Sequence, residues 1–166
     1  EVNLLDIDAT NLTGNLVISA ISPVNGFNDF EHIYVMDGFT GGVTDVLGTG
    51  PNDDLLVVDG GNNDLTKIPL ANFDIDAVHF NKNGTLTLTA EQVAAIGTTD
   101  GPDADHVADA WSALAGLNVT LNITELDSAS ASMALDLVAA AGINIGTVTI
   151  KDTNASVVIN PTTNLG

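Results

Sequence analysis

Short acidic side chains gather in turns rich in glycine and asparagine, and these residues are the best suited to chemistry. Ca²⁺ takes six to eight oxygen ligands, and closely spaced carboxylates on a turn can supply several of them, with carbonyl groups and water completing the shell. The sequence therefore predicts calcium ligands in two clusters. The first is Asn52, Asp53, Asp54, Asp59, Asn62 and Asp64, and the second is Asp100, Asp103 and Asp105, with Asp109 at its margin.

Both clusters also have a simpler explanation. Asp and Asn form turns and cap helices without any metal, through hydrogen bonds to nearby backbone groups. Neither cluster matches the EF-hand loop, which requires a Glu at its twelfth position. Turn formation and metal binding therefore both remain open for these residues.

The charge of the chain favours a cation as partner. The 166 residues include 22 acidic and only three basic side chains, for a net charge of −19. The basic residues are Lys67, Lys82 and Lys151, so no basic patch for nucleic acid or anionic lipid can form. No apolar run approaches the roughly 20 residues that span a bilayer. Bound Ca²⁺ would offset the carboxylate repulsion, and a halophilic cytosolic protein is the alternative.

Motifs for catalysis are missing from the sequence. There is no nucleophile elbow, phosphate-binding loop or dinucleotide fingerprint, and His32, His79 and His106 lack metal-ligand spacing. A glycosidase needs only two carboxylates, so a polysaccharide-active enzyme is kept as the weakest alternative. Trp111 belongs to an apolar pattern and is expected in the core, not on a sugar-binding platform. The sequence predicts a protein that is not an enzyme.

The first half of the chain has the pattern of short strands between turns. Apolar and β-branched residues fill segments of about five residues, and Gly, Asn and Asp separate them, as in sandwiches and solenoids. The predicted strands are 5–9, 16–20, 32–36, 55–58, 75–80 and 85–88.

The second half alternates helices with strands. Thr89 and Gln92 form a capping box that begins a short helix, and Gly97 ends it. Apolar spacing predicts two further helices, and strict alternation predicts the clearest strand, with its Asn and Thr side chains facing outward. These helices are expected at 104–115 and 128–141, and the strands at 117–124, 143–150 and 156–159.

The spacing of these units predicts the fold class. The helix and strand at 104–124 are echoed at 128–150, an offset of about 25 residues, which is the size of a solenoid coil. We therefore expect a mainly β protein, a parallel β-solenoid of the β-helix or β-roll kind with short helices in its C-terminal half. A β-sandwich is the alternative. Residues 1–166 are expected to form one domain, with strands and turns over 1–88 and helix–strand units over 89–166.

Two glycine- and aspartate-rich segments carry a family resemblance. Residues 48–56, with an inserted proline, resemble the nonapeptide of RTX proteins, and residues 60–65 resemble a second, degraded copy. The phrases at 5–16 and 84–92 are similar to segments of bacterial S-layer proteins and giant RTX adhesins. The resemblance is partial, touches about half the chain and conveys architecture more than activity.

The resemblance implies a secreted, Ca²⁺-ordered structural protein on the outside of a prokaryotic cell. Such a unit would associate head to tail with copies of itself in a surface layer, filament or adhesin stalk. The alternative is an adhesin module that binds a glycan or surface through Ca²⁺. Asn118 and Asn122 lie in glycosylation sequons on the outward face of the clearest strand and are the best candidate acceptors.

Overall fold

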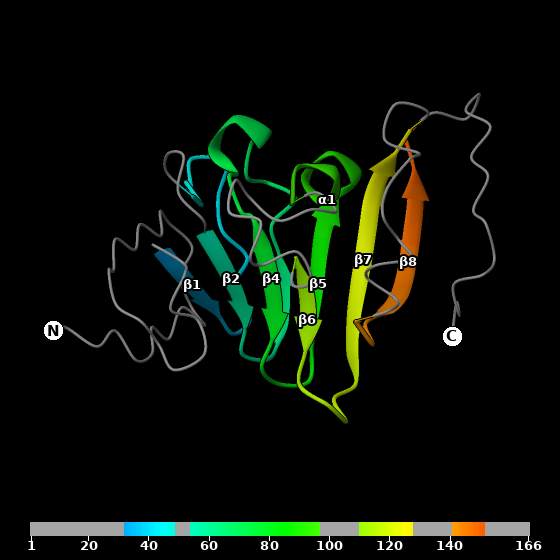
Figure 1. Cartoon of the computed structure of the whole chain (residues 1–166). Helices are drawn as coiled ribbons and strands as arrows, with labels where there is room; N and C mark the ends of the chain where they lie inside the picture. The colour runs from blue at the N-terminus through cyan, green and yellow to red at the C-terminus, as the bar shows by residue number, and fades with distance from the viewer. Residues whose placement is uncertain (1–31, 49–53, 97–109, 128–140, 152–166) are drawn as a thin grey trace, which may run out of the picture.

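The protein is mainly β and consists of two parallel sheets (Figure 1). The structure, a computed structural model, describes residues 32–48, 54–96, 110–127 and 141–151. The strands are β1 His32–Met36, β2 Asp54–Val58, β3 Asn62–Asp64, β4 Ala77–Phe80, β5 Gly84–Thr89, β6 Trp111–Ala113, β7 Val119–Leu126 and β8 Asn144–Ile150. The helices are the 3-10 turn η1 Leu70–Asn72 and the α-helix α1 Ala90–Ile96.

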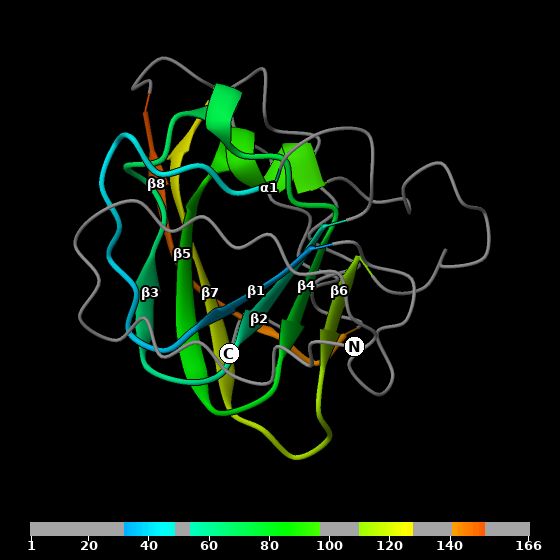
Figure 2. The ribbon, with the colours of Figure 1, turned by 90° about the vertical axis from the view of Figure 1, so that its left-hand side faces the viewer.

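Within the described residues, each sheet has four strands. The first sheet has the order β1-β2-β4-β6 and the second has the order β3-β5-β7-β8. Figure 2 shows the two sheets face to face, and the chain crosses from one to the other after β2, β4 and β6. Every strand pairing in the described residues is parallel. Parallel neighbours cannot be joined by a tight hairpin. Between β2 and β4, β3 and β5, β4 and β6, and β5 and β7, the connection passes through a strand of the opposite sheet.

The register of the sheets keeps a nearly constant sequence offset where the chain is regular. His32 lies opposite Asp54 and Leu55 opposite Ala77, an offset of 22 residues in both pairs. Asn62 lies opposite Thr85, an offset of 23. The offset grows to 33 where Val78 lies opposite Trp111. The connection from β5 to β6 is longer than that from β3 to β4 and includes α1, and the strands on either side still pair in register.

Strand alternation builds the main core between the sheets. On β5 and β7 the apolar residues at every second position are fully buried, as expected for strands with one face inward. The first sheet contributes larger side chains, among them Tyr34, Phe80 and Trp111. Its β2 is buried on both faces, and Leu55 and Val57 join Ile33 and Ala77 in a second, smaller apolar cluster.

The predicted capping box begins α1 and is confirmed. The Thr89 amide donates to the Gln92 side-chain oxygen at 2.9 Å, and the Gln92 amide donates to the Thr89 hydroxyl at 3.1 Å. The Gln92 side chain also reaches into the core, where its Nε2 donates to the carbonyls of Leu65 at 2.8 Å and Ile68 at 2.9 Å. One buried amide therefore caps the helix and ties it to the segment after β3.

The helix predicted over 104–115 is wrong for residues 111–113. These residues form β6, which pairs with β4, and Leu114 on the expected apolar face is exposed. The apolar spacing around Trp111 was compatible with a helix, but pairing with β4 satisfies the backbone groups of the segment and still buries Trp111. The placement of Trp111 in the core is confirmed.

The other predicted strands agree more closely with the strands of the structure. The strands expected at 32–36, 55–58, 85–88, 117–124 and 143–150 correspond to β1, β2, β5, β7 and β8, with small shifts at their ends. The strand expected at 75–80 begins only at Ala77, and β3 was not predicted. The predictions at 5–9, 16–20, 104–109, 128–140 and 156–159, and the helix end at Gly97, lie outside the described residues.

Candidate functional site

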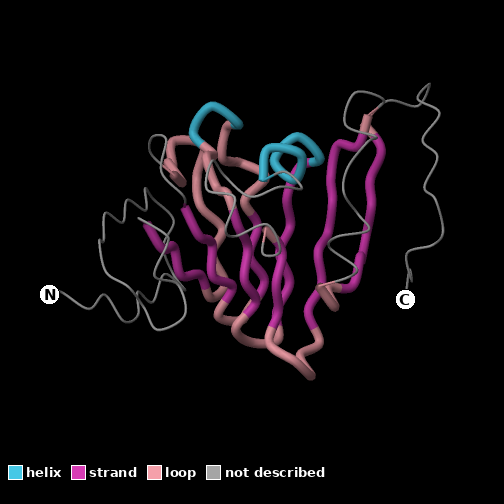
Figure 3. Tube along the Cα trace, viewed as in Figure 1, coloured by secondary structure: helices cyan, strands magenta, loops and turns pink. Residues whose placement is uncertain are grey.

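The turns that leave the first sheet lie beside one another along one edge of the molecule, opposite the helices (Figure 3). We call residues 37–38, 59–61, 81–83 and 114–118 the turn column. Backbone hydrogen bonds join the first residue of a turn to the last residue of the neighbouring strand: Asp59 N donates to Met36 O at 2.8 Å, Asn81 N to Val58 O at 3.0 Å and Leu114 N to Phe80 O at 3.1 Å. The parallel ladders thus continue into the turns that follow the strands.

Glycine is required where two turns of the column touch. Gly61 has a φ of 63°, and a Cβ added there would lie 2.5 Å from the Gly38 nitrogen and 2.7 Å from Asp37 Oδ1. Gly60 also has a positive φ, and its position leaves room for the same carboxylate. The pair Gly60 and Gly61 therefore allows one turn to approach the next closely.

Asp59 is the predicted calcium ligand that lies within the turn column. Its Oδ1 accepts a hydrogen bond from Asn81 Nδ2 at 2.7 Å, and its Oδ2 forms an ion pair with Lys82 Nζ. The Lys82 side chain is largely exposed, so the pair is worth at most about 1 kcal/mol. In this structure a lysine from the next turn occupies the place beside Asp59 that a cation would take.

Amide side chains continue the contacts along the column toward β8. Asn118 N donates to Asn83 Oδ1 at 2.8 Å, and Asn144 Nδ2 donates to Asn118 Oδ1 at 3.2 Å. The column thus changes from carboxylates at its β1 end to neutral amides at its β8 end. Asn and Asp here hold turn to turn by hydrogen bonds, a role that these residue types have in turns without any metal.

The other described residues of the first predicted cluster are strand residues outside the turn column. Asp54 is buried at the start of β2, Asn62 is exposed on β3, and Asp64 Oδ1 accepts from the amide and hydroxyl of Thr66 at 3.0 and 2.6 Å. Among the described residues, no three His, Cys, Asp or Glu side chains come together in a way that could hold a metal. Asn52, Asp53, Asp100, Asp103, Asp105 and Asp109 lie outside the described residues.

The outer face of the second sheet is polar, as expected from the alternation of β7. Thr85 lies opposite Thr120, Thr87 opposite Asn122 and Thr89 opposite Thr124, while the residues between them are buried. Asn118 is exposed at the start of this face. Asn122 is half-buried, and its Oδ1 accepts from the Thr147 amide at 2.9 Å. Asn118 is therefore the more accessible of the two candidate glycosylation sites.

His79 makes a contact of the kind expected for a structural residue. His79 is half-buried on β4, and its Nδ1 lies 2.8 Å from Ser112 Oγ on the neighbouring β6. This hydrogen bond joins two paired strands and requires neither metal nor substrate. His106 lies outside the described residues, as does the His32 side chain.

The sequence analysis missed two buried polar residues, Tyr34 within β1 and Asp45 in the loop between β1 and β2. Tyr34 is buried, and its hydroxyl oxygen accepts a hydrogen bond from the Gly48 amide at 2.9 Å. Asp45 is fully buried, and both of its carboxylate oxygens lack a hydrogen-bond partner in the described structure. One feature of the sequence pointed to burial of Asp45: it lies between Val43 and Val46, away from the turns that contain several acidic residues.

The burial of the Tyr34 hydroxyl leads to a prediction about stability at high pH. Burial of the phenol raises its pKa to about 12, with smaller contributions from the charges of Asp54 and Asp74. Because the folded pKa lies above the unfolded value near 10, this contribution to stability is fully present well below pH 10 and is lost as pH rises from 10 through 12, by up to about 3 kcal/mol. Tyr34 is the single tyrosine of the chain, so tyrosinate absorbance reports it alone. We expect the tyrosinate absorbance to have its titration midpoint near pH 12 in buffer and near pH 10 in urea. Equal midpoints would contradict the burial of Tyr34.

Comparison with known proteins finds no relative. The chain matches no protein family, no curated protein and no solved structure. Within the described ranges, neither helix has the length and apolar character to cross a bilayer.

Proposed function

We propose that the chain is a structural module of the extracellular surface of a prokaryotic cell, of the RTX or S-layer kind, and that it is not an enzyme. The observation that carries this proposal is the stack of in-register parallel strands and turns. Such a stack has no need of a substrate cleft, and its surfaces are repeated rows of similar side chains. Among the described residues, β1, β6, β3 and β8 lie at the ends of the two sheets, and the edge of a sheet is where a strand of another copy can pair.

The same stack supports a β-solenoid over a β-sandwich. The offsets of 22 and 23 residues on the two sheets correspond to one passage through both sheets and back. The turn column links successive passages by backbone hydrogen bonds. Antiparallel sandwiches are built from neighbouring strands of opposite direction, whereas the described ladders here are parallel. We therefore propose one solenoid domain over residues 1–166.

Calcium and self-association complete the proposal. The net charge of −19 favours a divalent cation that lowers carboxylate repulsion. Terminal strands of one copy would then add to those of the next, which gives an open filament if the contact does not close into a ring. Asn52, Asp53, Asp100, Asp103 and Asp105 remain proposed ligands on the strength of the sequence pattern alone.

The experiment that tests this function measures assembly. We expect the purified chain to form linear polymers in millimolar Ca²⁺, seen by light scattering and electron microscopy, and to return to monomer in chelator. Thr147→Lys places a charge on β8, the outermost described strand of the second sheet, and should reduce assembly at least tenfold, because edge lysines oppose strand addition. Thr85→Lys adds the same charge to the interior strand β5 and is the matched control. A chain that stays monomeric in Ca²⁺ would overturn the proposal.

An adhesin module is the second candidate. The outer Thr and Asn face of the second sheet favours it, because hydroxyl and amide groups in rows can hydrogen-bond to a sugar or a mineral-like surface. A monomer that binds a glycan array in Ca²⁺, and loses binding when Thr87 is changed to leucine, would support this function over a structural one.

A further inference from the structure

The turn between Gly42 and Asp45 reverses the usual placement of apolar and acidic side chains. The Asp45 amide donates to the Gly42 carbonyl at 3.3 Å, which places Val43 and Thr44 at the tip of the turn. Val43 is 63% exposed, the largest exposed fraction among the large hydrophobic residues described, whereas Asp45 is fully buried. Aspartate is almost never fully buried unless it is paired. The turn 42–45 therefore puts an apolar side chain in water and takes a carboxylate out of it.

The buried carboxylate of Asp45 has no compensating group within the described structure. Neither of its oxygens has a hydrogen-bond partner. A Cβ added to Gly41 would collide with Asp45 Oδ2 and with the ring of Phe39, so the acid lies against a glycine backbone and an aromatic ring. Burying such a group without partners is unfavourable, and a structure that retains one requires a physical reason.

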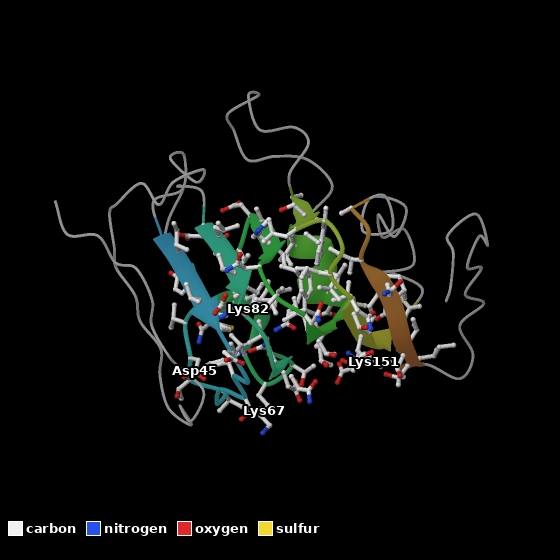
Figure 4. The ribbon with its side chains drawn as sticks, turned by 90° about the horizontal axis from the view of Figure 1, so that it is seen from below. Asp45, Lys67, Lys82 and Lys151 are labelled. Atoms are coloured by element: carbon white, nitrogen blue, oxygen red, sulfur yellow. The ribbon has the colours of Figure 1, made fainter. Side chains whose placement is uncertain are left out.

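No cation supplies that reason. Lys82 and Lys151 are paired with other acids. Lys67, the remaining basic residue, is exposed, and Figure 4 shows all three lysines apart from Asp45. The described residues also bring together no group of acidic or histidine side chains that could hold a metal. We therefore look for the compensation in a contact that a single copy of the chain does not make.

The turn 42–45 lies toward the β1 end of the stack. It follows β1, the outermost described strand of the first sheet, and Figure 4 shows Asp45 on this side and Lys151, which follows β8, on the opposite side. A head-to-tail contact between two copies joins such opposite ends. Each copy has a net charge of −19, so like-charge repulsion opposes the contact. Withdrawing an acid from the contact surface lessens that repulsion, and an apolar side chain at the tip adds surface that a partner can bury.

We infer that the turn 42–45 is a docking element for a second copy of this chain, in which Val43 makes the contact and Asp45 is held away from it. Burial of Val43 by the partner offsets the burial of Asp45, so closure of the turn and assembly favour each other. A second copy is the occupant because a cationic partner would be attracted by an exposed acid, and this turn conceals its acid. The inference rests on the proposed self-assembly and names a surface that it uses.

The test measures the lowest protein concentration at which the intact chain assembles in millimolar Ca²⁺. Val43→Asp should raise this concentration at least about tenfold, because it places a charge where two like-charged copies meet. Its site is exposed and aspartate suits a turn, so urea unfolding should be unchanged. Leu70→Asp is the matched control: Leu70 is 44% exposed and lies on η1, which leads into the interior strand β4. This control should assemble like the wild type.

Asp45→Asn provides a second measurement. Asparagine has nearly the shape of aspartate without its charge, so burial becomes less unfavourable while Val43 stays at the tip. The variant should unfold at a higher urea concentration than the wild type and assemble at the same or a lower protein concentration. Hydrogen exchange reports the turn itself. The Leu47 amide, which donates to the Asn72 carbonyl at 2.8 Å, should exchange at least about tenfold more slowly in the polymer than in the monomer.

Every other outcome contradicts the inference. If Val43→Asp assembles like the wild type, or Leu70→Asp is impaired equally, the tip of the turn is not the contact, and the proposed assembly still stands. An Asp45→Asn variant that is less stable than the wild type, or equal exchange of the Leu47 amide in polymer and monomer, would show that assembly does not compensate the buried acid. A wild type that stays monomeric would overturn the proposed function and this docking element together.

Discussion

Replacing Gln92 by leucine is expected to lower the free energy of unfolding by about 3 kcal/mol. Leucine has nearly the same size but cannot donate to the carbonyls of Leu65 and Ile68 or accept from the Thr89 amide. Each buried group left without its partner costs about 1–3 kcal/mol. The loss exceeds that of a surface helix cap, because the same side chain anchors α1 to the segment that follows β3.

Urea unfolding followed by the fluorescence of Trp111 measures this effect. Trp111 is the single tryptophan and lies in the core, so its emission reports the whole fold. Glu91→Ala, on the exposed side of the same helix, is the control and should change stability by less than about 0.5 kcal/mol. Gln92→Glu keeps an acceptor for Thr89 but lacks the donors, so it should be at least as unstable as the leucine variant. A leucine variant as stable as Glu91→Ala would show that the buried amide contributes little.

Replacing Gly61 by alanine is expected to cost about 3–4 kcal/mol, with two separable causes. Alanine at a φ of 63° costs about 1–2 kcal/mol by itself. Its Cβ would also lie 2.5 Å from Gly38 N and 2.9 Å from Gly38 Cα, so the turns after β1 and β2 would have to move apart. Backbone atoms cannot rotate away as a flexible side chain can, and we expect the second cause to be the larger.

Gly116 offers a matched control for this substitution. It has a φ of 83°, also in the left-handed region, but nothing lies within 4 Å of a Cβ added there. Gly116→Ala should therefore lose only the conformational part, about 1 kcal/mol. The difference between the two variants in urea unfolding measures how tightly the turn column is packed. Equal losses would mean that the turns after β1 and β2 do not depend on close contact.

Local patterns in the sequence predicted much of the second sheet. The alternation in β7 identified its buried residues, because a strand places successive side chains on opposite faces wherever it lies. The capping box at Thr89 and Gln92 identified the start of α1 for a similar reason, since its two hydrogen bonds are made within four residues. Neither prediction required knowledge of a distant part of the chain.

The same patterns failed where a distant partner decides the structure. Trp111 and its neighbours have spacing compatible with a helix, but pairing with β4, 33 residues away in the sequence, makes the segment a strand. The short β3 has no apolar alternation, and it forms because Asn62 to Asp64 lie beside β5. Among the predicted ligands, Asp59 lies in the turn column bound to a lysine and an asparagine from the next turn, contacts that no spacing rule anticipates.

The sequence by itself determined the charge, the strand faces and the turn chemistry of this protein. These properties depend on residue types and on sequence separations of a few residues, and both are the same in every conformation of the chain. Only the tertiary structure decided which strands pair, which turns stack and that Asp45 is enclosed without a partner. Burial and compensation of a charge depend on groups brought together from separate segments, so they exist only once the sheets have formed.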